Sequence, residues 1–513
     1  MSGANGNARH VDIAIVGSGF SGLGAAYRLK QAGIEDFEIL ERAEDVGGTW
    51  WANTYPGCQC DVASHLYSFS FAPNPDWTRT YSMQPEIQAY LRRTAERLDL
   101  VRYVRFGHEV RHSSWDEDTG VWRLDTAPGP VTARVLIGGQ GGLSEPRIPE
   151  IEGRESFKGP SFHSAAWDHS VDLRGKRVAV LGTGASAIQI VPSIQPEVGE
   201  LKVFQRTPPW IVPHTDRPTT RLERALYRRF PAIQRMVRRN VYWLREWLVI
   251  PMARRPGLLK PLERRSIAHM KKAVKDPELR RKLTPRYRIG CKRILPSNRW
   301  YPALAKPNVD VVTEGITAVR PEGIVTADGK LHELDVIVYA TGFHVTDIPF
   351  AHRVSGRDGR TLDEVWDGSP QAYKGSCVPG FPNLFFLLGP NTGLGHNSIV
   401  YMIESQVNYV VGALHKMRDR DVHAVEVKED AFALWNDAIQ RRMPPTVWNS
   451  GGCASWYIDK NGRNTTIWPD FTWKFRRLTK EFDIAAYEAV SPARDSAPGS
   501  DLPAAAPAGS LAG

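Results

Sequence analysis

Two glycine-rich turns, each directly following a short apolar run, constrain the fold of this chain more than any other feature. In the first turn, Gly17, Gly19 and Gly22 come after the apolar residues 13–16 and open a predicted helix. The first glycine of such a turn permits a tight bend, the second lets the backbone approach a pyrophosphate, and the third lets helix and strand pack closely. Because a strand precedes this turn and a helix follows it, we interpret it as a dinucleotide-binding unit and not as an ordinary glycine turn.

The second turn repeats this pattern later in the chain. Gly182, Gly184 and Ala187 follow the apolar run 177–181, and alanine is tolerated at the third position of the motif. The repeat predicts an α/β protein with two Rossmann-like dinucleotide-binding domains.

The residues that end the next predicted strand differ in charge between the two units. Glu41 lies 19 residues past Gly22, and Arg206 lies 19 residues past Ala187. A carboxylate accepts hydrogen bonds from free ribose hydroxyls, whereas an arginine suits a 2′-phosphate. We therefore expect FAD or NAD in the first unit and NADP in the second, the alternative being that Arg206 is only a solvated strand end. Two nucleotide sites in one chain favour hydride transfer from NADPH to a flavin.

The composition is that of a folded protein in a reducing compartment. The chain has 513 residues, of which 42% are hydrophobic and 24% charged, and these values are typical of globular proteins. Its five cysteines imply no disulfide framework, and we expect Cys58 and Cys60 to be plain buried thiols rather than a redox pair. No secretory signal, membrane-spanning run or metal-ligand spacing is apparent in the sequence. We therefore expect a cytoplasmic protein with no metal site.

The positive charge is concentrated in one segment. Residues 221–282 hold 19 Lys and Arg against 5 Asp and Glu, a charge of +14 in a chain of net charge +10. The segment is predicted to be helical, with Pro231 in the first turn of a helix that ends before Pro251. Five apolar residues at helical spacing are expected to face the core, namely Ile233, Val237, Val241, Leu244 and Leu248. We favour an insertion in the second unit with a solvated basic face, the alternative being a surface that contacts anionic lipid or a partner. No nucleic-acid-binding module is apparent.

Two longer stretches resemble the signatures of one enzyme family. The stretch FKGPSFHSAAWD at 157–168 fits the pattern FxGxxxHxxxW followed by Asp and stands just before the second glycine-rich turn. The stretch GGTWWANTYPGCQCD at 47–61 matches a second signature. On these motifs the chain resembles the type I Baeyer–Villiger monooxygenases over nearly its whole length between the tails. Trp167 distinguishes this resemblance, because related flavin enzymes that oxidise nitrogen or sulfur usually carry Tyr or Phe at that position.

The resemblance implies a reaction and three site residues. Enzymes of this family reduce FAD with NADPH, form a C4a-peroxyflavin with O2 and insert one oxygen atom beside a ketone carbonyl, which gives an ester or a lactone. The stretch RIGCKRILP at 288–296 resembles their active-site loop. By this resemblance Arg293 is the catalytic cation, Asp61 the carboxylate that orients it, and Lys292 a ligand of the 2′-phosphate. The implied partners are a small ketone and O2, the oligomeric state stays open, and oxidation of nitrogen or sulfur centres is the alternative function.

The resemblance also carries over cofactor-binding residues by position. The residues expected to bind FAD are Gly17, Gly19, Gly22, Glu41 and Asp61, to which the resemblance adds Ser21, Thr49, Trp50, Tyr67 and Val110. The residues expected to bind NADP are Gly182, Gly184, Arg206 and Lys292, to which it adds Thr183, Ala185, Ser186, Gln189 and Thr207. Trp456, in the stretch 450–464, matches the aromatic residue of a substrate and NADP loop, although the residues after it depart from the family pattern.

These interpretations divide the chain into seven segments. We expect disordered tails at 1–10 and 491–513, an FAD-binding domain at 11–150 and 376–490, an NADP-binding domain at 151–218 and 286–375, and the basic helical insertion at 219–285.

Overall fold

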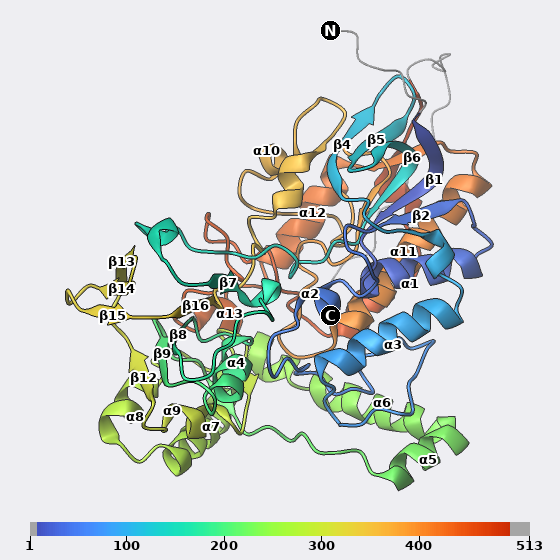
Figure 1. Cartoon of the computed structure of the whole chain (residues 1–513). Coiled ribbons are helices and arrows are strands. Elements are labelled where there is room, and N and C mark those ends of the chain that lie inside the picture. The colour runs from blue at the N-terminus through green and yellow to red at the C-terminus, as the bar shows by residue number, and fades with distance from the viewer. Residues whose placement is uncertain (1–7, 493–513) are drawn as a thin grey trace.

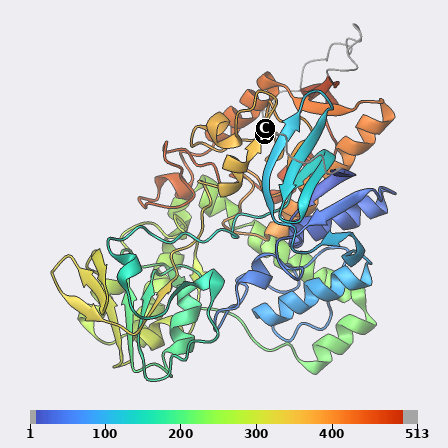
Figure 2. The ribbon, with the colours of Figure 1, turned by 45° about the horizontal axis from the view of Figure 1, so that its top comes forward.

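The computed structural model describes residues 8–492, which form two halves built around two separate sheets (Figure 1). Figure 2 shows the halves beside each other, with the antiparallel strands of the first half at one end and the short yellow hairpins of the second at the other. The expected α/β fold with two Rossmann-like halves is confirmed. The tails expected at 1–10 and 491–513 lie almost wholly outside the described residues, but Arg9 and His10 already belong to the first strand.

The first half contains an eight-stranded sheet in the order β17-β4-β5-β6-β1-β2-β3, with β18 also paired to β6. Its strands are β1 (Arg9–Val16), β2 (Phe37–Leu40), β3 (Val104–Arg105), β4 (Val110–Asp116), β5 (Val121–Thr126), β6 (Gly129–Gly138), β17 (Val354–Ser355) and β18 (Leu384–Phe386). β1 runs parallel to both β2 and β6. The ends of β1 and β2 therefore lie at one edge of the sheet, where dinucleotides bind in folds of this kind.

Alternating residues of β1 bury both faces of this sheet. Ile13 and Ile15 pack with α1 (Phe20–Gln31) and α11 (Ile399–Asp419), whereas Ala14 belongs to the opposite face. Because successive side chains of a strand point to opposite faces, the apolar residues 13–16 at the end of β1 fit a sheet covered on both sides. The remaining elements of this half are α2 (Thr49–Ala52), α3 (Gln84–Arg97), α10 (Leu362–Trp366), α12 (Glu429–Gln440), α14 (Thr472–Leu478), β19 (Ala424–Val427) and β20 (Tyr487–Val490). Helix α13 (Val447–Ser450) packs in a cluster with Trp210, Tyr287 and Cys291 of the second half.

The second half contains a fully parallel sheet in the order β12-β9-β8-β16-β7. Its strands are β7 (Ser161–His163), β8 (Arg177–Leu181), β9 (Glu200–Phe204), β12 (Val309–Val312) and β16 (Val336–Tyr339), and its helices α4 (Ala187–Ile194) and α9 (Trp300–Leu304) pack against each other. An antiparallel sheet of β13 (Ile316–Arg320), β14 (Gly323–Thr326) and β15 (Leu331–Glu333) and a pair formed by β10 (Ile211–Val212) and β11 (Leu295–Pro296) complete it.

The chain returns to the first half earlier than the sequence boundary at 375 suggests. β17 pairs with β4 through Val354 and Ser113, so the first sheet resumes at residue 354. The strand has only two residues, and so short an edge strand leaves no periodic pattern in the sequence.

The basic segment is helical, as expected, but it is not confined to the second half. It consists of α5 (Arg221–Arg229), α6 (Pro231–Glu246), α7 (Lys260–Ala273) and α8 (Pro277–Leu283). Helix α6 lies against the first half, where Gln234 donates to the carbonyl of Asn74 at 2.6 Å and Arg238 to that of His65 at 2.7 Å, whereas α7 returns to β10. The expected apolar face is also partly wrong, because Leu244 is 75% and Leu248 39% exposed.

The cysteines divide into two groups. Cys58, Cys60 and Cys377 are free and buried, so the expected plain thiols at 58 and 60 are confirmed. Cys291 and Cys453 form a disulfide across 162 residues of sequence, which the cysteine count did not predict. Among residues 8–492, no helix is both long and apolar enough to cross a membrane.

The contact between Gly22 and Gly17 gives a first prediction. A Cβ on Gly22 would lie 1.9 Å from the Gly17 carbonyl oxygen, so Gly22→Ala must displace the backbone of the turn. We expect a loss of about 1 to 3 kcal/mol in stability and a lower flavin content after gel filtration. Gly184→Ala is the matched control, because its Cβ would meet nothing within 4 Å. Equal flavin content in the two variants would contradict the close packing of this turn.

Candidate active site

A cavity of about 1500 Å³ lies between the two halves. With one exception, every site residue predicted from the sequence lines it. The lining residues are Gly17, Gly19, Ser21, Glu41, Thr49, Trp50, Asp61, Tyr67, Val110, Gly182, Thr183, Gly184, Ala185, Ser186, Gln189, Arg206, Thr207, Lys292, Arg293 and Trp456. The exception is Gly22, which lies in α1 and packs against Gly17.

The first glycine turn forms a cradle that fits a dinucleotide. Gly17 adopts a φ of +91°, which disfavours any residue with a Cβ. The N-terminus of α1 has no acidic residue in its first turn and no side-chain cap, so its amide groups are available to an anion. Glu41 is buried at the end of β2, and its carboxylate accepts hydrogen bonds from the Ser18 amide and hydroxyl, both at 2.7 Å.

The second turn opens onto the same cavity with a basic rim. Gly182 has a φ of +115°, and at Gly184 the space beyond the backbone is open. Thr183 donates to the Thr207 carbonyl at 3.0 Å and so joins the turn to the end of β9.

Arg206 and Lys292 supply the positive charge of this rim. Burial lowers the pKa of Lys292, and the nearby charge of Arg206 lowers it further. Neither side chain forms an ion pair with any residue of the described range 8–492, so two cations share a site without an acid to neutralise them. Such a pair fits a phosphate.

Asp61 and Arg293 form a bidentate ion pair from opposite halves. Arg293 Nε lies 2.6 Å from Asp61 Oδ2, and its Nη2 lies 2.6 Å from Oδ1. Burial by itself raises the pKa of Asp61, but the charge and hydrogen bonds of Arg293 outweigh it and the pKa is lowered. Asp61 in turn raises the pKa of Arg293, so both groups remain charged.

The segment after α13 reaches the same cavity through Trp456. Trp456 is 43% exposed at the cavity, and its ring meets that of Tyr457 edge to face at 4.4 Å. Tyr457 is buried, and burial raises its pKa to about 12 against the charge of Arg293. The disulfide from Cys453 to Cys291 ties this segment to the loop that carries Arg293.

The structure adds site residues that the sequence motifs did not indicate. Arg245 of α6 donates through Nη2 to the Asp61 carbonyl at 3.0 Å. Gln189, expected at the NADP pyrophosphate, lines the cavity. Its side chain also accepts from the Tyr55 hydroxyl at 3.0 Å and donates to the Gln59 carbonyl at 2.9 Å, so it links the halves. The turn after β18 lines the cavity at residues 388–390, 392–394 and 397. Its glycine-rich run GPNTGLG follows an apolar stretch, and this pattern in the sequence could have indicated a further part of the site.

The chain matches known flavoproteins along most of its length. The family model for flavin-binding monooxygenase-like proteins matches residues 10–354. A Baeyer–Villiger monooxygenase from Streptomyces coelicolor is 52% identical over 485 residues, covering 94% of this chain and 93% of that protein. A second Baeyer–Villiger monooxygenase, from Pseudomonas aeruginosa, is 52% identical over 482 residues, covering 94% of this chain and 92% of that protein.

The chain belongs to the Baeyer–Villiger monooxygenases. Solved structures agree with this assignment. The closed crystal structure of cyclohexanone monooxygenase superposes with a TM-score of 0.84 at 29% identity, covering 94% of this chain and 99% of that one. The OTEMO complex with FAD and NADP superposes with a TM-score of 0.84 at 29% identity, covering 94% of this chain and 100% of that one. A steroid monooxygenase bound to NADP superposes with a TM-score of 0.82 at 31% identity, covering 94% of this chain and 99% of that one.

This Baeyer–Villiger monooxygenase is an FAD- and NADPH-dependent enzyme that inserts one oxygen atom beside a ketone carbonyl. The alternative, oxidation of nitrogen or sulfur centres, is not favoured by these relatives. The two nucleotide sites expected from the opposite charges of Glu41 and Arg206 agree with the cofactor pair.

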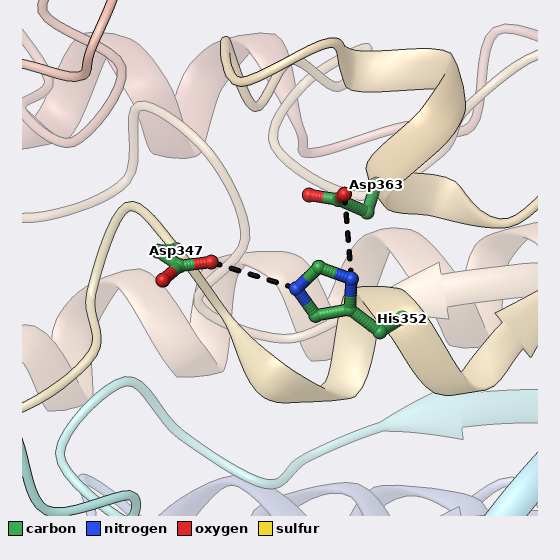
Figure 3. A group of neighbouring side chains, drawn as sticks. All are labelled: Asp347, His352 and Asp363. Atoms are coloured by element: carbon green, nitrogen blue, oxygen red, sulfur yellow. Dashed lines mark ion pairs between the residues drawn. The ribbon is translucent and has the colours of Figure 1, made fainter.

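One group of possible metal ligands occurs among residues 8–492, formed by Asp347, His352 and Asp363 (Figure 3). The imidazole lies between the two carboxylates, with Nε2 3.5 Å from Asp347 Oδ1 and Nδ1 3.3 Å from Asp363 Oδ2. Each ring nitrogen of His352 therefore pairs with a different carboxylate. None of the three residues lines the cavity.

Proposed function

We propose that Arg293 is the catalytic cation of this Baeyer–Villiger monooxygenase and that Asp61 positions it. The observation that carries the proposal is the bidentate pair, which uses Nε and Nη2 and leaves Nη1 without an acceptor among residues 8–492. The Arg293 side chain lines the cavity and is 37% exposed. A guanidinium fixed on one edge by a carboxylate can aim its remaining N–H groups at one point.

The residues of the first half fit FAD. The glycine cradle, the free N-terminus of α1 and the Glu41 carboxylate match a pyrophosphate and a ribose, and Trp50 and Tyr67 line the cavity farther in. When bound, the flavin supplies the activation of O2 with electrons taken from NADPH. The protein then has to hold the ketone, orient its carbonyl and keep water from the reacting atoms.

Arg293 is placed to orient the ketone and to stabilise charge. Its free N–H groups would donate to the carbonyl oxygen, on which negative charge develops as the carbonyl carbon is attacked. A fixed donor costs no reorganisation at that moment. The ion pair with Asp61 keeps the guanidinium from swinging away, and Trp456 lines the same cavity.

We further propose that Arg206 and Lys292 bind the 2′-phosphate of NADPH, with Trp456 in the loop that covers the substrate and the nicotinamide. The two cations share one rim and have no acid partner in the described chain, which supports a dianionic ligand there. The dependence on NADPH also supports action in the cytoplasm.

Replacing Arg206 tests the phosphate assignment. Loss of one charge-assisted contact costs about 1.5 to 3 kcal/mol, so Arg206→Ala should raise the NADPH concentration required about ten- to hundredfold and leave the use of NADH almost unchanged. Steady-state oxidation of both cofactors measures this. Arg320→Ala, which removes an exposed arginine paired with Glu152, is the matched control. Equal losses with NADPH and NADH would refute the assignment.

Replacing Arg293 tests the catalytic assignment. Arg293→Ala should keep FAD bound and NADPH oxidation measurable, while ester formation falls about a hundred- to thousandfold and the consumed NADPH appears as hydrogen peroxide. Arg293→Lys should not restore activity, because Lys lacks the planar fork. Asp61→Asn should show a milder defect of the same kind, since Asp61 acts through Arg293.

The control for these variants is Arg286→Ala, which removes an exposed cation from the same loop. Product analysis by gas chromatography together with a peroxide assay distinguishes coupled from uncoupled turnover. Ester formation by Arg293→Ala at a near wild-type rate would overturn the assignment.

A further inference from the structure

The outer face of α6 exposes large apolar side chains to solvent. Met236 is 47%, Trp243 43%, Leu244 75% and Trp247, the residue that follows the helix, 59% exposed. Their spacing of 7, 8 and 11 residues from Met236 places them along one side of the helix. Soluble proteins rarely expose a contiguous apolar surface of this kind without a use for it.

The inner face of the same helix is held by polar contacts, so the outer face cannot turn inward. Gln234, Arg238 and Arg245 donate to backbone carbonyls of the first half. Glu246 is fully buried and accepts hydrogen bonds from Asn397 at 2.6 Å and from the Thr472 hydroxyl at 2.9 Å. Rotating the helix would leave these buried groups unpaired, which is costly.

The exposed surface continues from α6 onto α14. The Trp247 ring meets that of Phe471 edge to face at 6.3 Å, and Phe471 lies 5.9 Å from Trp473, which is 36% exposed. Arg254 lies over Phe471 at 5.4 Å and Lys474 over Trp473 at 5.8 Å. We name Met236, Trp243, Leu244, Trp247 and Trp473 the α6 patch.

The exposed charges of α6 beside the patch are positive, whereas near Trp473 the buried Asp470 pairs with Arg254 and Lys474. Between residues 229 and 260 the chain carries eight Lys and Arg and a single acid, Glu246, which is buried. Arg235 and Arg239 are exposed on α6 beside the patch. Tryptophan at an interface, with arginine and lysine around it, is the composition of helices that lie in the plane of an anionic membrane surface.

We propose that the α6 patch docks on an anionic lipid bilayer. The tryptophans and leucine would enter the headgroup region, and Arg235 and Arg239 would meet the lipid phosphates. A second copy of the chain fits less well, because a two-fold contact through this face would bring like-charged arginines of both copies together.

Vesicle flotation with the FAD-loaded enzyme tests the proposal. The enzyme should float with phosphatidylglycerol–phosphatidylcholine vesicles, bind at least about tenfold more weakly to pure phosphatidylcholine, and be released by about 0.5 M salt. The double change Trp243→Ala and Trp247→Ala should weaken binding at least about tenfold. Arg235→Glu with Arg239→Glu should do the same, because each cation near the surface contributes a factor of about five.

Leu434→Ala and Arg418→Glu are the controls, since both residues are 65% exposed on other helices, and neither change should alter flotation. All variants should oxidise a water-soluble ketone at the wild-type rate, which shows that they are folded. Failure of the wild type to float, equal binding to neutral vesicles, or unchanged flotation of both double variants would overturn the proposal. A dimer that light scattering detects and that Trp243→Ala with Trp247→Ala dissociates would also overturn it.

Discussion

The ion pair between Asp61 and Arg293 is the interaction on which the active site depends. Asp61 lies in a loop of the first half, and Arg293 lies 232 residues later in a loop of the second. Two charges withdrawn from water stabilise each other only when the geometry is good and the remaining donors have partners. Here the two hydrogen bonds of 2.6 Å supply the geometry, and the Arg293 donor without a partner among residues 8–492 belongs to a side chain that lines the cavity and is 37% exposed. The pair forms only when the halves pack correctly, so it couples domain arrangement to the position of the cation.

Helix α6 adds a contact to the ion pair through Arg245, which donates to the Asp61 carbonyl. Burial acts to raise the pKa of Glu246, but hydrogen bonds from Asn397 and Thr472 and the neighbouring His396 lower it, so the carboxylate is held as an anion. These contacts fix α6 against the first half, which brings Arg245 to Asp61. A segment that looks like a basic insertion of the second half thus supports Asp61, and its outer surface carries the exposed α6 patch.

The sequence was most informative where local backbone geometry restricts the residue. Gly17 and Gly182 have positive φ values and stand where the chain passes from a strand to a helix, so their spacing alone indicated two nucleotide sites. The opposite charges of Glu41 and Arg206 then predicted free ribose hydroxyls in the first site and a 2′-phosphate in the second. The periodicity of α6 was less informative, because apolar residues occur on both its inner and outer faces and the pattern cannot show which face meets the core.

By itself, the sequence determined the two βαβ units, the residues that line their turns and the positive charge of residues 221–282. These follow from short-range sterics and composition, which act within a few residues. The family resemblance implied that Asp61 meets Arg293, but only the tertiary structure decided the bidentate geometry of that pair. It alone also decided that Cys291 joins Cys453, that α6 crosses to the first half and that β17 extends the first sheet. Each of these contacts joins residues far apart in the chain, and its free energy comes from the desolvation and packing of both partners at once. No local pattern records it.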